Sequence, residues 1–204
     1  MQMTVSHKQR LEDTIEALSD ELKWGLRYFY AAKILLETNL RLTPTLFDTF
    51  YFSCLDQAGL ILARMVIAKE NNDASINLQY LSHQAQNKSA LFHYAKQGEI
   101  KTLVKEQAQL FELHEPLIRT LKDQRDQNIS HLDRRHVNEP KWRESQTQLD
   151  LVQVEKLYQD LIRVMTTYYR LFHGAKLDFG DWESASQAEV QNLAEYYEAY
   201  RSKV

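Results

Sequence analysis

The chain contains few of the residues that build tight turns. Its 204 residues include five glycines and three prolines. This scarcity excludes a fold with many hairpin turns, such as a β sandwich. Leucine, alanine, glutamate, glutamine and lysine are plentiful instead, and these residues favour helix. The sequence therefore predicts an all-α fold.

Cysteine and long apolar runs are also nearly absent. Cys54 is the one cysteine, so no disulfide can form within the chain, and a reducing compartment is favoured. Residues 1–10 lack the apolar core of a secretory signal. The most apolar stretch, residues 46–68, is interrupted by Asp48, Asp56 and Arg64, which is too broken for a membrane span. We expect a cytoplasmic protein without a membrane partner, and Cys54 to act as a small apolar residue.

Several common site motifs are missing from the sequence. It has no glycine-rich phosphate loop, no CxxC pair and no HExxH. No glutamate stands three residues before a histidine, which argues against the di-metal centre of ferritin-like bundles. We therefore expect no metal and no cofactor.

Apolar residues at helical spacing predict the elements. Gly25 is expected to mark a bend or a close contact, and Pro116 to bend or restart a helix. Residues 74–88 are expected to form either an irregular link or a short helix, and the pattern does not decide between them. The tyrosines near the end of the chain are expected to pack on the bundle rather than to stack on a ligand: Tyr196, Tyr197 and Tyr200. The expected helices cover residues 6–40, as one long helix or two end to end, and residues 44–70, 88–97, 99–135, 149–173 and 186–202.

We expect four main helices and short additional ones to form a bundle over residues 1–174. Residues 175–204 would form a C-terminal helical extension packed on the same domain.

Charge is unevenly distributed along the chain. The net charge is −3, which gives no reason to expect DNA binding. Residues 117–143 carry seven basic and four acidic side chains, a local charge of +3, which leaves −6 for the rest. This segment is either a solvated helix face or a local site for an anion.

Arg125 and His131 lie within the basic segment. Arginine holds phosphate through paired donors, and histidine transfers protons near neutral pH. Together they suit metal-free cleavage of an RNA phosphodiester, in which the arginine stabilises the transition-state charge. On an ideal helix, however, residues six apart point about 120° apart and are separated by a rise of about 9 Å. They converge only if the helix bends or ends between them, or if two chains meet.

The run from Arg125 to Asp133, with Asp126 directly after the arginine and Asn128 before His131, resembles the HEPN superfamily. It is most similar to the abortive-infection branch, whose members are small helical bundles and often metal-independent RNases. The resemblance covers the architecture of residues 20–173 and implies a homodimer in which two copies of the motif line one cleft.

The resemblance implies a role for each residue of the motif. Arg125 and His131 would be catalytic, Asp126 would orient Arg125 or a histidine tautomer, and Asn128 would bind the phosphate. Neighbouring basic residues would contact RNA: Arg119, Lys122, Arg134 and Arg135. An antitoxin or regulatory protein is a possible partner. HEPN toxins paired with a nucleotidyltransferase often carry a modifiable tyrosine two residues after the histidine, but this chain has Asp133.

Two other interpretations remain open from the residues alone. The chain could be a non-catalytic helical module that binds a nucleotide or a protein with the same cleft. It could also be a structural bundle in which the Arg125–His131 spacing is accidental. Dimer geometry distinguishes these interpretations, because the RNase reading needs both side chains to face one open basic cleft.

Overall fold

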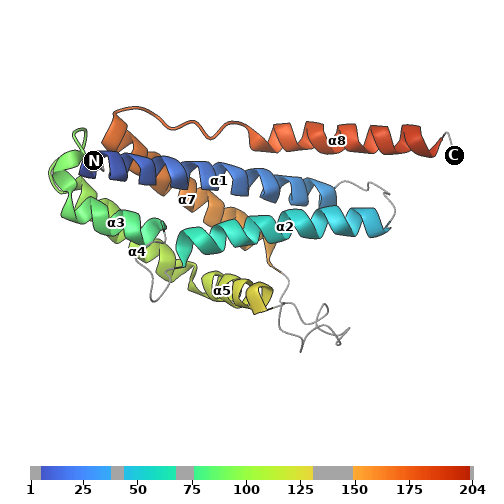
Figure 1. Ribbon diagram of the computed structural model, residues 1–204, viewed down its shortest axis with the longest axis horizontal. Helices are drawn as coiled ribbons and strands as arrows, with labels where there is room; N and C mark the ends of the chain where they lie inside the picture. The colour runs from blue at the N-terminus through green and yellow to red at the C-terminus, as the bar shows by residue number, and fades with distance from the viewer. Residues whose placement is uncertain (1–5, 38–43, 68–75, 131–148, 203–204) are drawn as a thin grey trace, which may run out of the picture.

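The computed structural model describes residues 6–37, 44–67, 76–130 and 149–202, without the side chains of residues 44–48, 126–130 and 201. Within these residues the secondary structure is entirely helical, as predicted (Figure 1). No helix in this part of the chain is long and apolar enough to cross a membrane. The elements are α1 (His7–Glu37), α2 (Pro44–Val66), α3 (Leu78–Asn87), the 3-10 turn η1 (Ser89–Leu91), α4 (Glu99–Leu113), α5 (Glu115–Ser130), α7 (Leu151–His173) and α8 (Trp182–Arg201).

An antiparallel pair, α1 and α2, forms the centre of the molecule, and α7 packs across it (Figure 1). The apolar residues of α1 that recur every three or four positions are buried, as the periodicity predicts: Leu11, Ile15, Leu18, Leu22, Leu26 and Phe29. Gly25 marks a close contact. A Cβ atom there would lie 2.5 Å from the hydroxyl oxygen of Tyr158 on α7 and 2.8 Å from Ile61 on α2.

The expected long helix over residues 99–135 is divided in two. α4 ends at Leu113, His114 caps it, and α5 starts at Glu115. Pro116 falls in the first turn of α5, where its missing N–H leaves no helical hydrogen bond unmade. The restart directs α5 onto the outer side of α2, as Figure 1 shows.

Short elements differ most from the predictions. The expected helix over residues 88–97 is wrong, because only η1 and turns occupy this range. The ambiguous segment before it contains α3, which starts where the Asn77 side chain accepts a hydrogen bond from the backbone N–H of Tyr80. The last helix begins at Trp182, four residues before the expected start, because Asp181 caps it by accepting from the N–H of Ser184. The ends of three expected helices, residues 38–40, 68–70 and 131–135, lie outside the described residues.

α8 packs along α1, and Figure 1 shows that it extends beyond the end of α1. Val190 and Ala194 are buried on this contact. The prediction that the tyrosines pack on the bundle holds for Tyr197, which contacts the core. It is wrong for Tyr196 and Tyr200, which are 77% and 69% exposed.

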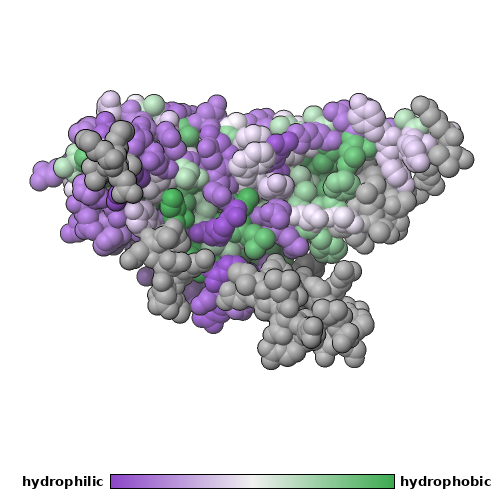
Figure 2. Space-filling model, in the orientation of Figure 1, coloured by the Kyte–Doolittle hydropathy of each residue, from purple (hydrophilic) through white to green (hydrophobic). Residues whose placement is uncertain are grey.

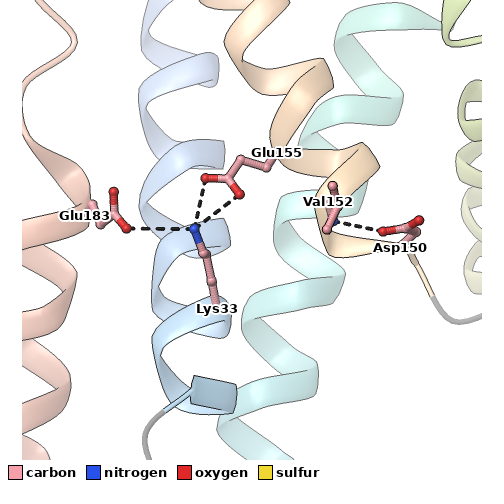
Figure 3. A network of polar contacts seen from close by, with 5 residues as sticks. All are labelled: Lys33, Asp150, Val152, Glu155 and Glu183. Carbon is pink, nitrogen blue, oxygen red and sulfur yellow. Dashed lines mark hydrogen bonds and ion pairs between the residues drawn. The ribbon is translucent and has the colours of Figure 1, made fainter.

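One half-buried lysine connects three helices (Figure 3). Lys33 of α1 donates to both carboxylate oxygens of Glu155 on α7, at 3.0 and 3.2 Å, and lies 3.8 Å from Glu183 on α8. The hydrogen bond to Glu155 is the main reason that the pKa of Lys33 is raised. Close by, Asp150 caps α7 by accepting from the N–H of Val152. The charged cluster therefore fixes α7 and α8 against α1.

Candidate functional site

Arg125 lies on the side of α5 that faces α2. Leu117 and Leu121, which precede it at intervals of four residues, are 5% and 1% exposed and pack in the core. Residues four apart share one side of a helix. Arg125 therefore continues the buried stripe one turn further and is half-buried, whereas Lys122 and Asp123 are exposed.

Arg125 lines a small hollow between α5 and α2. The hollow has a volume of about 10 Å³, which is room for about one water molecule. A single chain therefore offers no nucleotide-sized pocket among the described residues at Arg125. The lining residues are Asp56, Gly59 and Leu60 of α2 and Leu121, Gln124 and Arg125 of α5.

Other residues of the expected site are only partly described. Asp126 and Asn128 lie in the helical backbone of α5, but their side chains are not described. His131, Arg134 and Arg135 lie outside the described residues. The structure therefore leaves the pairing of Arg125 with His131 as a prediction.

Arg119 and Lys122, the expected RNA contacts on α5, are both on its surface. The Arg119 side chain is 72% exposed and forms an ion pair with Glu115 on the preceding turn. Such an exposed pair contributes little to stability. Arg119 can therefore exchange this partner for a phosphate at little cost.

The backbone of α5 is helical without interruption from Arg125 to Ser130. The described part of α5 therefore has no break that would turn the chain back towards Arg125. On a regular helix Arg125 and position 131 would stay about 120° apart. Two ways of bringing Arg125 and His131 together therefore remain. The chain changes direction where α5 ends, or the two residues meet across a contact between two chains.

The chain returns to the same place after the stretch that carries His131. Leu149 is buried, and its side chain approaches the position that a Cβ on Gly59 would occupy to within 3.4 Å. Leu121 lies 3.7 Å from the same position. Both described ends of the intervening segment, α5 and Leu149, are thus anchored on α2 beside Arg125.

Apolar surface lies next to this region. Phe50 and Phe52 in the first turns of α2 are 40% and 52% exposed, and Leu36 near the end of α1 is 53% exposed. Figure 2 shows hydrophobic surface gathered at this end of the molecule. Phe52 stands one helical turn before Asp56, which lines the hollow at Arg125. An exposed apolar patch of this kind is typical of a protein contact surface.

Two larger hollows lie away from Arg125. One, of about 580 Å³, is formed by η1 and the start of α4. The other, of about 570 Å³, lies between α4 and α7. The second is bordered by Asp160, whose carboxylate oxygen lies 2.9 Å from Nε2 of the buried His114, within hydrogen-bond distance. His114 thereby joins the α4–α5 junction to α7, a structural role.

Cys54 behaves as the sequence predicts. Its side chain is half-buried against the core, and burial raises the pKa of its thiol. A raised pKa disfavours the thiolate, so Cys54 is unsuited to be a nucleophile.

Sequence reasoning missed the two polar residues beside Arg125. Gln124 immediately precedes the arginine and lines the hollow, whereas Asp56 comes from α2, 69 positions earlier in the chain. The sequence did carry one signal for Asp56. Its carboxylate interrupts the most apolar stretch of the sequence, at a position that faces another helix in the structure.

Comparison with known proteins identifies one family. The model of the family HEPN_AbiU2, described as AbiU2, matches residues 8–193, which is most of the chain. The match includes all of α5 and extends past Gly174 into α8. No curated protein and no solved structure matches the chain.

Proposed function

The chain belongs to the AbiU2 family of HEPN abortive-infection proteins, and we propose that it is a metal-independent endoribonuclease that acts as a toxin or antiphage effector. The observation that carries the proposal is the position of Arg125. It is the residue at which the buried stripe of α5 becomes polar, six positions before His131 in the motif that resembles HEPN RNases.

The proposed reaction is an internal transphosphorylation. A histidine acting as base removes the proton of the 2′-hydroxyl, whose oxygen attacks the adjacent phosphorus. The bond from phosphorus to the 5′-oxygen breaks, and a histidine acting as acid protonates that oxygen. Arg125 stabilises the extra negative charge on the phosphoryl oxygens in the transition state. The products are a 2′,3′-cyclic phosphate and a 5′-hydroxyl.

We assign the base and the acid to the His131 residues of two chains. One histidine cannot easily act as base and acid in the same step, because the base must lack the proton that the acid carries. A homodimer supplies two histidines. The uninterrupted helix from Arg125 to Ser130 supports this assignment, because no bend there turns position 131 towards Arg125. The exposed Phe52, one helical turn before Asp56 on α2, offers apolar surface for the second chain.

Supporting roles follow from the same arrangement. Asp126 orients Arg125 or fixes a histidine tautomer, and Asn128 hydrogen-bonds the phosphate. Arg119, Lys122, Arg134 and Arg135 attract the RNA backbone. Because Asp133 replaces the tyrosine modified in some HEPN toxins, we expect regulation by a protein partner rather than by modification at that position.

The role of Arg125 is tested by cleavage of a labelled RNA with Arg125→Ala and Arg125→Lys. If the guanidinium binds the phosphoryl group through paired donors, alanine should lower the cleavage rate by about 10²–10³-fold. Lysine should restore only part of the rate, because it keeps the charge but loses the fork geometry. The matched control is Arg10→Ala, since Arg10 is exposed near the start of α1.

Circular dichroism and the elution volume must match those of the wild type, since Arg125 is half-buried. Equal cleavage by the wild type and Arg125→Ala would contradict the proposed role. RNA binding without cleavage by any of these proteins would favour the alternative, a non-catalytic module that uses the same surface.

A further inference from the structure

A group of metal-binding side chains lies where the start of α1 meets the end of α7. Glu12 and Glu16 stand one turn apart on α1, and His173 is the last residue of α7. One ligand atom from each residue lies within 4.8 Å of the other two. Figure 1 shows that these two helix ends lie together, away from the end of α5.

The three side chains are close without being paired. Among the described residues, no hydrogen bond or ion pair engages the carboxylate of Glu12 or Glu16. Two carboxylates brought together repel one another unless a cation lies between them. A metal bound at about 2.0–2.2 Å from each ligand atom would draw the three atoms closer together.

The imidazole of His173 supplies an independent observation. Its Nε2 atom is buried, yet it has no hydrogen-bond partner among the described residues. A buried polar atom without a partner is rare in folded proteins and often indicates an ion or a water that fills the space. In the sequence alone, His173 had no feature that distinguished it from the other histidines.

The surroundings hold the imidazole in place. The ring of His173 lies 4.3 Å from that of Tyr169 and 4.9 Å from that of Phe172, measured between ring centres. The chain then turns at Gly174, where a Cβ would lie 2.5 Å from the ring of Tyr94. The carboxyl end of α7 also carries the partial negative charge of the helix dipole, which favours a cation.

We propose that Glu12, Glu16 and His173 bind one divalent transition metal ion of the Zn²⁺ class. Two carboxylates and an imidazole are common ligands of such ions, whereas Ca²⁺ and Mg²⁺ take oxygen ligands throughout. Water completes the coordination shell. The ion ties the start of α1 to the end of α7, just before the segment that leads to α8. Its role is structural, and it is independent of RNA cleavage at Arg125.

The test is titration of metal-stripped full-length protein with ZnCl₂ by isothermal calorimetry, with melting temperature as a second readout. We expect one equivalent of Zn²⁺ to bind and to raise the melting temperature, and CaCl₂ at the same concentration to do neither. Loss of a second-shell partner typically weakens metal affinity 10–100-fold, and loss of a direct ligand should cost at least as much.

Glu16→Gln is the decisive variant, because Glu16 is exposed and the substitution keeps its shape, so the fold should survive. We expect it to weaken Zn²⁺ binding at least tenfold, and Glu12→Gln to do the same. The matched control, Glu106→Gln, changes an exposed glutamate of α4 and should bind like the wild type. The absence of saturable one-to-one binding, or wild-type affinity in both Glu12→Gln and Glu16→Gln, would overturn the proposal.

Discussion

At the scale of residues, the account depends on where single side chains meet neighbouring helices. Arg125 lies at the edge of the contact between α5 and α2, where the side chains of Leu121 and Gln124 approach Gly59 to ordinary van der Waals distance. Gly25 permits an even closer approach in the centre of the bundle, under Tyr158. The hydroxyl of Tyr158 donates to the carbonyl oxygen of Ala58 at 3.0 Å, so one buried tyrosine connects all three central helices.

Gly25→Ala should therefore destabilise the protein. The added methyl group would lie 2.5 Å from the Tyr158 hydroxyl oxygen and 2.8 Å from Ile61, and overpacking of this kind costs about 1–3 kcal/mol. Urea denaturation measures the loss. In the matched control, Gly59→Ala, the nearest atom lies at 3.4 Å. The control should be neutral or up to about 1 kcal/mol more stable, because alanine favours helix. Equal stability of the two variants would contradict the close packing at Gly25.

At the scale of elements, periodicity predicted the long helices well but not their ends or their exposed edges. α1 and α7 lie close to the predicted ranges because each buries a continuous apolar stripe, and α7 stops at Gly174 as expected. Leu36 fits the stripe of α1 by spacing but is 53% exposed, whereas Val152 stands two positions before the buried Val154, on the other side of α7, and is 74% exposed. Spacing identifies one side of a helix, and only the length of the neighbouring helix decides how far along that side burial extends.

The candidate site was predictable only in part. The motif from Arg125 to His131 is local, so the sequence alone predicts it, and the family match includes the whole of it. Asp56 beside Arg125 and the approach of Leu149 to Gly59 depend on how α5 and the start of α7 cross α2. Such crossings are set by tertiary packing, which spacing within one helix does not encode.

The α4–α5 junction should be sensitive to His114. Its ring is 6% exposed, and Nε2 lies 2.9 Å from the Asp160 carboxylate. We expect His114→Ala to lower the free energy of unfolding by about 1–3 kcal/mol, because it leaves Asp160 without this partner. His83→Ala is the control, since His83 is exposed on α3. If both variants unfold at the same urea concentration, His114 does not fix the junction.

The Lys33 cluster should stabilise the protein more than an exposed ion pair does. Lys33→Met removes the cation from between Glu155 and Glu183, and the Lys33 side chain is only 21% exposed. We expect a loss of about 1 kcal/mol, against less than about 0.5 kcal/mol for Arg64→Ala. The Arg64–Glu21 pair is the matched control because its side chains are 59% and 42% exposed.

The contribution of Lys33 should also depend on pH in one direction. The pKa of Lys33 is raised above 10.5 in the folded protein. Stability from the pair is therefore fully present below the unfolded pKa of about 10.4 and is lost as pH rises through the folded pKa. The difference in unfolding free energy between the wild type and Lys33→Met should be constant from about pH 7 to 9 and should shrink above about pH 10.5. A difference that grows with pH would contradict this assignment.

At the scale of the whole molecule, two separate regions have different proposed roles. The region formed by α5 and the start of α2 would contact a second chain and RNA. The end where α1 starts and α7 stops would bind a structural metal ion. The central pair of helices separates them, so each proposal can fail without the other.

The dimer proposal is tested by Phe52→Glu. Phe52 is 52% exposed, and a charge there should oppose burial against a second chain. The wild type should have a mass of about 48.2 kDa by light scattering, twice the 24.1 kDa of one chain, and the variant should approach the mass of one chain and lose RNA cleavage. Leu113→Glu is the control, since Leu113 is equally apolar and 62% exposed on α4. A wild-type mass of one chain would refute the dimer.

The measurement that tests the central claim most directly is RNA cleavage by the wild type beside His131→Ala, in EDTA, with the product ends mapped. Cleavage by the wild type should survive EDTA, leave a 2′,3′-cyclic phosphate and a 5′-hydroxyl, and disappear in the variant. Cleavage that requires a metal ion, leaves a 3′-hydroxyl or persists in His131→Ala would contradict the account. So would the absence of cleavage of several RNAs by a folded dimer.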